Sequence, residues 1–263
     1  MLQKVNDPEF DWFVSEIKKK IDLDLTGYKP HRVKRRTDIL LRKHNVDNYR
    51  DYMKMIMNDE KLKDEFLDKL TINVTEFFRN PEKWASLQKK YLPEMIKKVG
   101  PRIKIWSAGC SSGEEPYTWA IILEELRANQ ARITASDIDS GVLAKARKGI
   151  YEKRSFENTS VDIMKKYFKK VDDERYEVSQ KLKSRVNFRK HNMLQENFDK
   201  DLDFISCRNV VIYFEMETKN VLYKNFVKAL KPGGILFVGS TERIFNYRQI
   251  GLKVIEPFFY QKV

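Results

Sequence analysis

From residue 101 onward, short apolar runs alternate with helical segments, and this alternation constrains the fold more than any other feature of the chain. The strand candidates are IKIW, RITAS, SRVNF, LDFIS, ILFVG and VIEPFFY, and most are separated by helical stretches such as PYTWAIILEELRA, SGVLAKARK and METKNVLYKNFVKAL. Strands that alternate with helices form a mostly parallel sheet, whose ligands bind at the carboxyl ends of the strands. We therefore expect an α/β, Rossmann-like domain over residues 101–263, in which LKPGG at 230–234 forms a helix stop and a turn.

The first 72 residues carry helical signals and almost no strand signals. Asp7, Pro8 and Glu9 form the pattern of an N-cap, an N1 proline and a first-turn acid. The apolar residues after them follow helical spacing: Phe10, Phe13, Val14, Ile17 and Ile21. Further helices are expected at 29–44 and in LKDEFLDKL. We predict a small helical domain over residues 1–72 and a connector over 73–100.

A polar, basic segment at about 151–185 interrupts the alternation of strands and helices. Within it, RYEVS and LKSRVNF are separated by two residues, which favours a β-hairpin. We expect an inserted hairpin subdomain at the edge of the sheet.

The composition indicates an acidic partner and gives no sign of a membrane span. Lys and Arg number 51 against 38 Asp and Glu, a net charge of +13. Such a surplus favours nucleic acid, an anionic membrane or an acidic protein surface, although a solvated basic surface is the alternative. No run approaches about 18 apolar residues, and MLQKVNDPEFDW lacks a signal-peptide core, so a cytoplasmic protein is expected. Neither the two cysteines, Cys110 and Cys207, nor the three histidines show metal spacing, so we expect no metal.

The loop SAGCSSGEEPYTWA, which follows the first strand candidate, has the wrong charges for a phosphate site. Gly109 and Gly113 would allow close approach of a ligand, but Glu114 and Glu115 would repel a phosphate. A ligand with a positive group and no phosphate fits better, and S-adenosylmethionine has both properties. The alternative is that the glutamates only favour the first helical turn. We favour that alternative for Glu114 and ligand binding for Glu115.

The next strand candidate ends in ASDID, which supplies a second acidic position. Asp137 lies 24 residues after Gly113 (137 − 113), close to the spacing of about 20 at which an acid binds ribose hydroxyls. Asp139 is better placed as an N-cap for the following helix.

Four motifs in this order resemble the chemotaxis receptor methyltransferase family of the CheR type: NVTEFFRN (73–80), SSGEEPYTWA (111–120), ASDID (135–139) and CRNVVIYF (207–214). The resemblance covers nearly the whole chain. It implies a class I methyltransferase domain and S-adenosylmethionine as cofactor, with S-adenosylhomocysteine as product. The implied cofactor-binding residues are Asn73, Thr75, Arg79, Glu115, Asp137, Asn192, Met193, Arg208 and Asn209. Arg79 and Tyr213 are expected to orient the substrate in catalysis.

Some of these positions have a purely structural alternative. Asn73 and Thr75 could be a capping pair, and Met193 and Tyr213 could pack in the core. Arg79 is harder to explain in this way, because an arginine that follows two phenylalanines needs a polar partner for its guanidinium.

The resemblance further implies a protein-glutamate O-methyltransferase that methylates glutamate side chains on the cytoplasmic helices of chemoreceptors. The enzyme would be a cytoplasmic monomer, recruited to membrane receptor arrays, with no nucleic-acid partner and no membrane insertion. A basic helical face with Arg32, Arg35 and Arg36 is the predicted surface for acidic receptor helices.

One departure from part of the family concerns recruitment. Members that dock on a receptor's C-terminal peptide carry a glycine-rich loop in the inserted hairpin, whereas VDDERYEVSQKLKSRV has no glycine. We therefore expect this chain to act independently of such a tether peptide.

Two other functions are weighed against this one. A nucleic-acid methyltransferase would suit the charge, but enzymes that methylate amino groups often carry an Asn/Asp-Pro-Pro-aromatic element where this chain has CRNVVIYF. An inactive binding module with the same fold is disfavoured, because Arg79, Glu115, Asp137 and Tyr213 are all present.

Overall fold

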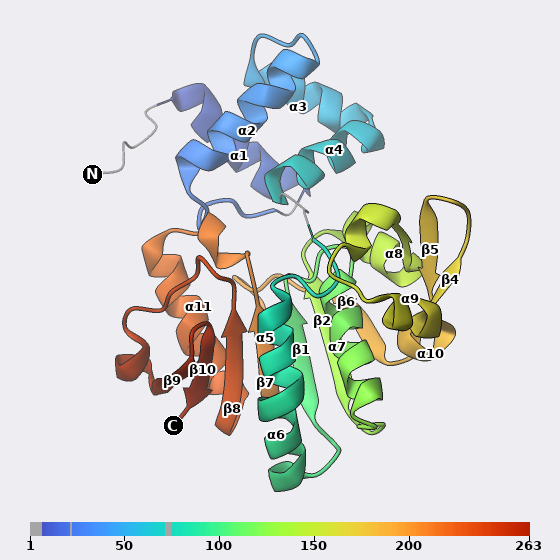
Figure 1. The fold of residues 1–263 in the computed structure, drawn as a ribbon. Coiled ribbons are helices and arrows are strands. Elements are labelled where there is room, and N and C mark those ends of the chain that lie inside the picture. The colour runs from blue at the N-terminus through green and yellow to red at the C-terminus, as the bar shows by residue number, and fades with distance from the viewer. Residues whose placement is uncertain (1–6, 22, 72–74) are drawn as a thin grey trace. The chain divides into compact units, whose positions relative to one another are not determined.

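The computed structural model describes residues 7–21, 23–71 and 75–263, and the chain divides into two units (Figure 1). The first unit comprises Met1–Asn73 together with Ile212–Asn220. The second comprises Val74–Val211 and Val221–Val263. Within the described ranges, no helix is both long and apolar enough to cross a bilayer.

In the part of the chain described up to residue 71, the first unit contains the helices α1 (Pro8–Ile21), α2 (Pro30–Lys43), α3 (Tyr49–Asn58) and α4 (Glu60–Thr71). The predicted start of α1 is confirmed, because the Asp7 carboxylate accepts a hydrogen bond from the Phe10 amide at 3.1 Å. Phe13 is fully buried and packs on Tyr49 at 5.4 Å and on Phe66, edge to face, at 5.7 Å between ring centroids. Aromatic packing among α1, α3 and α4 thus forms the core of this unit.

The segment 212–220 belongs to the first unit, although the chain on either side of it belongs to the second. The Lys29 amide donates to the Tyr213 carbonyl at 2.9 Å, and the Glu215 amide donates to the Gly27 carbonyl at 3.0 Å. Tyr28 and Phe214 form an antiparallel bridge, and their rings meet edge to face at 4.8 Å. The sequence did not predict this attachment. The 3-10 turn η3 (Val211–Tyr213) leads into it, and α11 (Met216–Ala229) leads out.

The second unit is built on a seven-stranded sheet in the order β6-β2-β1-β7-β8-β10-β9. The strands are β1 (Lys104–Ala108), β2 (Arg132–Asp137), β6 (Val186–Lys190), β7 (Leu202–Cys207), β8 (Leu230–Val238), β9 (Leu252–Glu256) and β10 (Phe259–Lys262). The pairs among β6, β2, β1, β7 and β8 are parallel, and β10 is antiparallel to both of its neighbours. The predicted Rossmann-like class is confirmed.

Two details of the predicted strands differ from the structure. VIEPFFY, expected as one strand, spans parts of β9 and β10, and the chain reverses through Phe258 at a φ of 77°. LKPGG follows the end of α11 as expected, but it forms the beginning of β8 rather than a separate turn.

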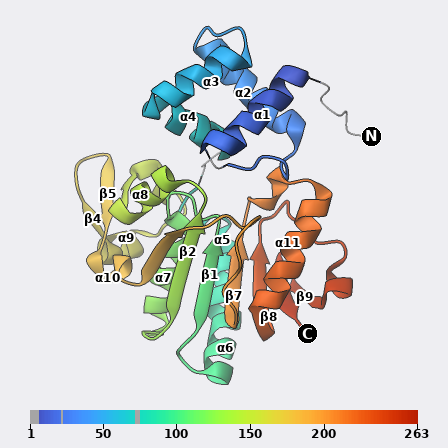
Figure 2. The same cartoon turned by 180° about the vertical axis from the view of Figure 1, so that it is seen from behind.

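Helices cover both faces of this sheet (Figures 1 and 2). One face carries α5 (Pro81–Ser86), the π-helical turn η1 (Leu87–Tyr91), α6 (Leu92–Val99) and α7 (Glu114–Glu125), and residues 221–229 of α11 lie on the other. Trp84 packs edge to face on Trp119 at 5.3 Å and on Phe237 at 5.5 Å. On the opposite face Trp106 contacts Phe226 at 5.6 Å. The short 3-10 turn η4 (Tyr247–Ile250) precedes β9.

The insertion forms its own three-stranded antiparallel sheet in the order β3-β5-β4. Its elements are β3 (Ile150–Glu152), η2 (Lys153–Phe156), α9 (Val161–Tyr167), β4 (Phe168–Lys170), β5 (Arg175–Val178) and α10 (Gln180–Lys183), and α8 (Ser140–Lys148) precedes it. The predicted pairing of RYEVS with LKSRVNF is wrong. Residues 180–183 form a helical turn that buries Leu182, so β6 joins the main sheet beside β2, and β5 pairs with β3 and β4.

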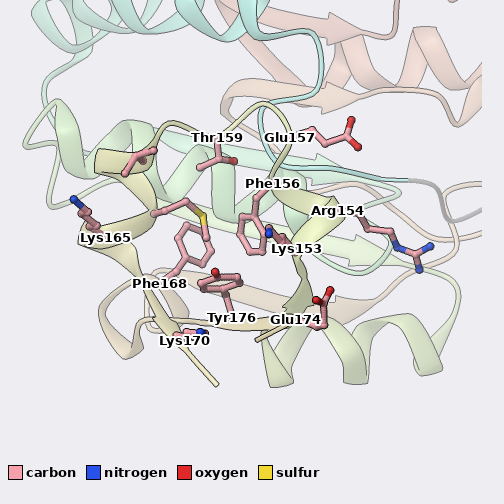
Figure 3. A pocket seen from close by; sticks show the side chains of 12 residues that line it. Lys153, Arg154, Phe156, Glu157, Thr159, Lys165, Phe168, Lys170, Glu174 and Tyr176 are labelled. Atoms are coloured by element: carbon pink, nitrogen blue, oxygen red, sulfur yellow. The ribbon is translucent and has the colours of Figure 1, made fainter. Parts of the chain in front are cut away.

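A cavity of about 850 Å³ lies in this insertion (Figure 3). Phe156, Phe168 and Tyr176 line it together with Met164, and lysine side chains lie around them. None of the predicted site residues is among the 12 that line it.

Candidate functional site

The candidate site of the second unit lies where β1, β2 and β7 end. β1 pairs in parallel with both other strands, with Ser107 opposite Ala135 and Ser206. Because parallel strands end at the same edge of a sheet, the loops after these three strands meet there. The sequence placed Asp137 at the end of its strand, Arg208 in the loop that follows, and Glu115 at the start of the helix after the first loop.

The loop between β1 and α7 requires its two glycines. Gly109 and Gly113 have φ values of 73° and 97°, in the left-handed region that glycine tolerates. A Cβ at Gly109 would lie 2.5 Å from the Val210 side chain, and one at Gly113 would lie 2.8 Å from Ala146 Cβ. We expected these glycines to allow a ligand to approach, but the structure shows that they are needed for close packing of the protein itself.

Glu115 is held at the start of α7 by three side chains. The hydroxyls of Ser107 and Ser206 donate to its Oε1 at 2.8 and 2.6 Å, and Arg208 lies 3.4 Å from its Oε2. Trp119 in turn donates to the Ser206 hydroxyl at 3.0 Å. The carboxylate is therefore fixed in orientation while its side chain stays 15% exposed. It is suited to accept hydrogen bonds from a ligand ammonium group.

The neighbouring Glu114 is buried, at 4% exposure, rather than displayed on the first helical turn. The Ser112 hydroxyl donates to its carboxylate at 2.7 Å, and the Ser112 carbonyl accepts a hydrogen bond of 2.6 Å from the Tyr151 hydroxyl. Burial raises the pKa of Glu114 to about 7, against the opposing effect of the Ser112 hydrogen bond. Glu114 does begin α7, as expected, but its burial was not predicted.

Asp137 ends β2 and faces the glycine loop. Its carboxylate accepts hydrogen bonds from the amides of Ser111 at 2.8 Å and Asp139 at 3.1 Å. Burial raises its pKa to about 6, although these backbone hydrogen bonds act in the opposite direction. Asp139 accepts from the amides of Gly141 and Val142, which confirms the predicted N-cap of α8.

Arg208 connects the third strand end to the NVTEFFRN motif. Its buried guanidinium donates to the Arg79 carbonyl at 2.8 Å and to the Asn80 side-chain oxygen at 2.7 Å, besides pairing with Glu115. The Trp84 indole donates to the same Arg79 carbonyl at 3.0 Å. The backbone of Arg79 is thus fixed by two donors.

The backbone on either side of half-buried Arg79 adopts a strained conformation. Phe78 and Asn80 have φ values of 54° and 61°, and non-glycine residues with positive φ concentrate at functional sites. The Phe78 amide donates to the Thr118 hydroxyl at 3.1 Å. Phe77 is buried and its ring stacks on Phe156 of the insertion at 4.8 Å. These anchors give the Arg79 side chain a defined starting point.

Asn209 is positioned by a residue that the sequence analysis missed. The buried Glu242 carboxylate accepts hydrogen bonds of 2.7 Å from the amides of Asn209 and Gly239. This arrangement holds Asn209 at a φ of 60° directly after Arg208. An acid in the GSTE stretch, close to the end of the strand candidate ILFVG, was the available signal, since Asp137 likewise lies at the end of a strand candidate.

Asn192 and Met193 lie two and three residues after the end of β6. The His191 amide donates to the Asp137 carbonyl at 2.9 Å, which places this turn next to the end of β2. The Asn192 side-chain oxygen accepts from the Leu194 amide at 3.0 Å, so it stabilises the turn. Met193 is half-buried.

Six further predicted site residues are left. Asn73 lies outside the described residues, and Thr75 is half-buried. Tyr213, Arg32, Arg35 and Arg36 belong to the first unit.

The predicted basic face of α2 needs a correction. Arg36 was expected on that face, but it is buried, because its guanidinium donates to the Leu70 carbonyl and lies over the Tyr213 ring. Arg35 is exposed and Arg32 half-buried, so these two remain accessible.

The residues gathered at the ends of β1, β2 and β7, chiefly Glu115, Asp137 and Arg208, form a strand-end cluster that fits S-adenosylmethionine. Glu115 and Asp137 supply the acceptors that an ammonium group and ribose hydroxyls require. Two further buried polar atoms, Ser111 Oγ and Arg208 Nε, have no hydrogen-bond partner among the residues that the structure describes. Such atoms at a strand-end cluster are suited to a polar ligand. In the same described ranges, no group of three or more His, Cys, Asp or Glu side chains is arranged to hold a metal ion.

Comparison with known proteins identifies the same chemistry. Residues 8–71 match the family model described as "CheR methyltransferase, all-alpha domain", and residues 73–256 match "CheR methyltransferase, SAM binding domain". A chemotaxis protein methyltransferase of Listeria monocytogenes is 35% identical over 257 residues, which cover 97% of this chain and 98% of the relative. One of Borreliella burgdorferi is 33% identical over 273 residues, which cover 98% of this chain and 95% of the relative. A solved TehB-like methyltransferase of Corynebacterium glutamicum covers 70% of this chain and 94% of its own at 14% identity, with a TM-score of 0.38, a similarity too weak to bear on function.

Proposed function

Because the chain belongs to the CheR methyltransferase family, and is thus an S-adenosylmethionine-dependent methyltransferase, we propose that it methylates specific glutamate side chains on the cytoplasmic helices of chemoreceptors. The products are glutamyl methyl esters and S-adenosylhomocysteine. The observation that carries the proposal is the match of both family domains, over residues 8–71 and 73–256.

The strand-end cluster supports a division of roles in holding the cofactor. Glu115, fixed by two serines and Arg208, accepts from the ammonium group, and Asp137 accepts from the ribose hydroxyls. Asn192 and Met193 flank the adenine, and the other predicted contacts are Asn73, Thr75, Arg79, Arg208 and Asn209. S-adenosylmethionine supplies the methyl group to be transferred, activated as a sulfonium substituent.

The reaction needs little general-base catalysis, because its nucleophile already exists. A glutamate has a reference pKa of about 4.3, so at pH 7 fewer than roughly one in 100 are protonated. What the protein contributes is placement of one carboxylate oxygen in line with the methyl carbon at about 3–3.5 Å, which can supply roughly 7–11 kcal/mol.

Arg79 and Tyr213 orient the incoming carboxylate. Arg79 holds one oxygen while the other attacks, since a tight bidentate clamp on both oxygens would stabilise the ground state. The fixed Arg79 backbone supports this role, because a side chain can orient a substrate only if its own base is held.

The accessible cations of α2, Arg35 and Arg32, are the proposed docking surface for acidic receptor helices. Attraction between exposed opposite charges is screened by salt, so receptor affinity should fall as ionic strength rises. Neutralising Arg35 should weaken that salt dependence.

We further propose that the chain does not require a receptor's C-terminal tether peptide. The segment at 171–186 that would carry the glycine-rich docking loop contains no glycine, and it includes the connection from β4 to β5, then β5 and α10. Strong, saturable binding of such a terminal peptide to the chain would contradict this.

The test of the catalytic assignment compares Arg79→Ala and Tyr213→Phe with Arg102→Ala, which changes an exposed arginine hydrogen-bonded to Gln130. Turnover on a receptor cytoplasmic fragment should fall by at least about 100-fold for Arg79→Ala and stay unchanged for Arg102→Ala. Circular dichroism confirms that each variant is folded. Wild-type turnover in Arg79→Ala would remove Arg79 from the mechanism.

A further inference from the structure

Arg36, a buried arginine of the first unit, contacts two segments of that unit. One is the end of α4, just before the NVTEFFRN motif, and the other contains Tyr213 of the CRNVVIYF motif. Arg36 of α2 is 6% exposed. Its Nη1 donates to the carbonyl of Leu70, in the last turn of α4 and three residues before the NVTEFFRN motif. Its guanidinium lies over the Tyr213 ring, 4.8 Å from the centroid.

The backbone around Tyr213 is held without help from Arg36. Its carbonyl accepts from the Lys29 amide, and the flanking Phe214 and Glu215 pair with the backbone of Tyr28 and Gly27. These main-chain hydrogen bonds involve no atom of Arg36. The contact of Arg36 with this segment is with the Tyr213 side chain.

The contact has a physical reason to be specific. A guanidinium is planar and stacks on an aromatic face while its N–H groups reach other acceptors, which a lysine ammonium cannot do in the same geometry. A buried cation is also costly unless it is paired, so the Leu70 carbonyl and the Tyr213 side chain are the partners that make Arg36 tolerable there.

We propose that Arg36 is a positioning residue for methyl transfer, which fixes the Tyr213 side chain while its exposed neighbour Arg35 docks the receptor. This inference rests on the proposed function, since Tyr213 has a catalytic role only if the chain methylates receptor glutamates. Two consecutive arginines of one helix would then act on different steps.

The experiment measures kcat and KM on a receptor cytoplasmic fragment for full-length Arg36→Lys and Arg35→Ala. The control, Arg50→Lys, changes another arginine of the first unit that lies 4.4 Å from a ring, that of Trp12, but contacts no predicted catalytic residue. We expect Arg36→Lys to lower kcat at least 10-fold with KM changed less than 2-fold. Arg35→Ala should raise KM at least 3-fold at constant kcat, and Arg50→Lys should change neither.

A double-mutant cycle separates positioning from a general loss of stability. If Arg36 acts through Tyr213, Arg36→Lys should have no further effect on kcat in a Tyr213→Ala background. The same fold-loss in that background, an unchanged kcat, or an effect on KM alone would overturn the proposal.

A second readout keeps the inference distinct from the proposed function. In protein labelled with 3-fluorotyrosine, the ¹⁹F resonance assigned by Tyr213→Phe should shift in Arg36→Lys and stay in place in Arg50→Lys. Failure of the proposed function looks different, because the wild-type chain itself would leave the fragment unmethylated. An unshifted resonance would show that Arg36 does not fix the ring.

Discussion

The guanidinium of Arg208 donates a 2.8 Å hydrogen bond to the backbone carbonyl of Arg79, 129 residues earlier in the chain. The same guanidinium pairs with Glu115 at 3.4 Å. The buried guanidinium of Arg208 therefore connects Glu115, the carboxylate proposed to bind the cofactor, with the backbone of Arg79, the proposed catalytic arginine. Because both contacts depend on the planar fork of arginine, a lysine cannot reproduce them together.

Replacing Arg208 by lysine should therefore affect both parts of the site. We expect affinity for S-adenosylmethionine to fall about 10-fold or more and turnover to fall further, since Arg79 loses one of two donors to its carbonyl. Isothermal titration and steady-state kinetics measure the two effects. Arg208→Lys with wild-type turnover would show that the connection has no role in catalysis.

Replacing Glu115 by glutamine should weaken cofactor binding, and it should also lower stability because the buried Arg208 loses its charge partner. A charge-assisted hydrogen bond contributes about 1.5–3 kcal/mol, so affinity should fall roughly 10- to 150-fold. Glu125→Gln, at the other end of α7, is the matched control and should bind the cofactor normally. Equal affinities in the two variants would refute the ammonium-binding role of Glu115.

Glu114 predicts an unusual dependence of stability on pH. Its pKa is raised from 4.5 to about 7 by burial, so the folded chain holds this proton more tightly than the unfolded chain. The free energy of unfolding should therefore decrease as pH rises from about 4.5 to about 7 through this group. Glutamine at 114 does not titrate, so the Glu114→Gln variant avoids this loss. The change in the free energy of unfolding caused by Glu114→Gln should be about 2–3 kcal/mol more favourable at pH 8 than at pH 5. Urea unfolding at both pH values measures this, and a pH-independent effect would contradict it.

Asp137 predicts that cofactor affinity depends on pH. Burial raises its pKa to about 6, and only the deprotonated carboxylate accepts from both ribose hydroxyls. Affinity for S-adenosylmethionine should be constant above about pH 7 and fall toward roughly 10-fold per pH unit below pH 6. Asp137→Asn should bind weakly at every pH and lose this profile. Glu114→Gln is the control, because Glu114 titrates in the same loop, and it should retain the decline below pH 6.

The strand-end acids could be predicted because they depend on local patterns. A strand, a loop and a helix in sequence place Glu115 at a helix start, and the next strand places Asp137 at the same edge of a parallel sheet. The N-caps at Asp7 and Asp139 are likewise local, since each side chain bonds to amides two or three residues away.

The parts that could not be predicted depend on partners distant in sequence. The sequence placed Arg32, Arg35 and Arg36 on one helical face, and no local pattern shows that Leu70 and Tyr213 supply a buried site for Arg36. The predicted strand pairing in the insertion was wrong for a related reason. The two residues between RYEVS and LKSRVNF look like a hairpin turn, but burial of Leu182 favours a helical turn. Tertiary packing decided both cases.

The most direct test of the proposed substrate uses methyl-labelled S-adenosylmethionine. The wild-type chain is offered a receptor cytoplasmic fragment and, in a parallel reaction, RNA, and each product is treated with mild alkali before volatile label is counted. We predict base-labile label from the receptor fragment alone, as expected for glutamyl methyl esters, and its loss in Arg79→Ala. Label on the RNA, or base-stable label on the fragment, would contradict methylation of receptor glutamates.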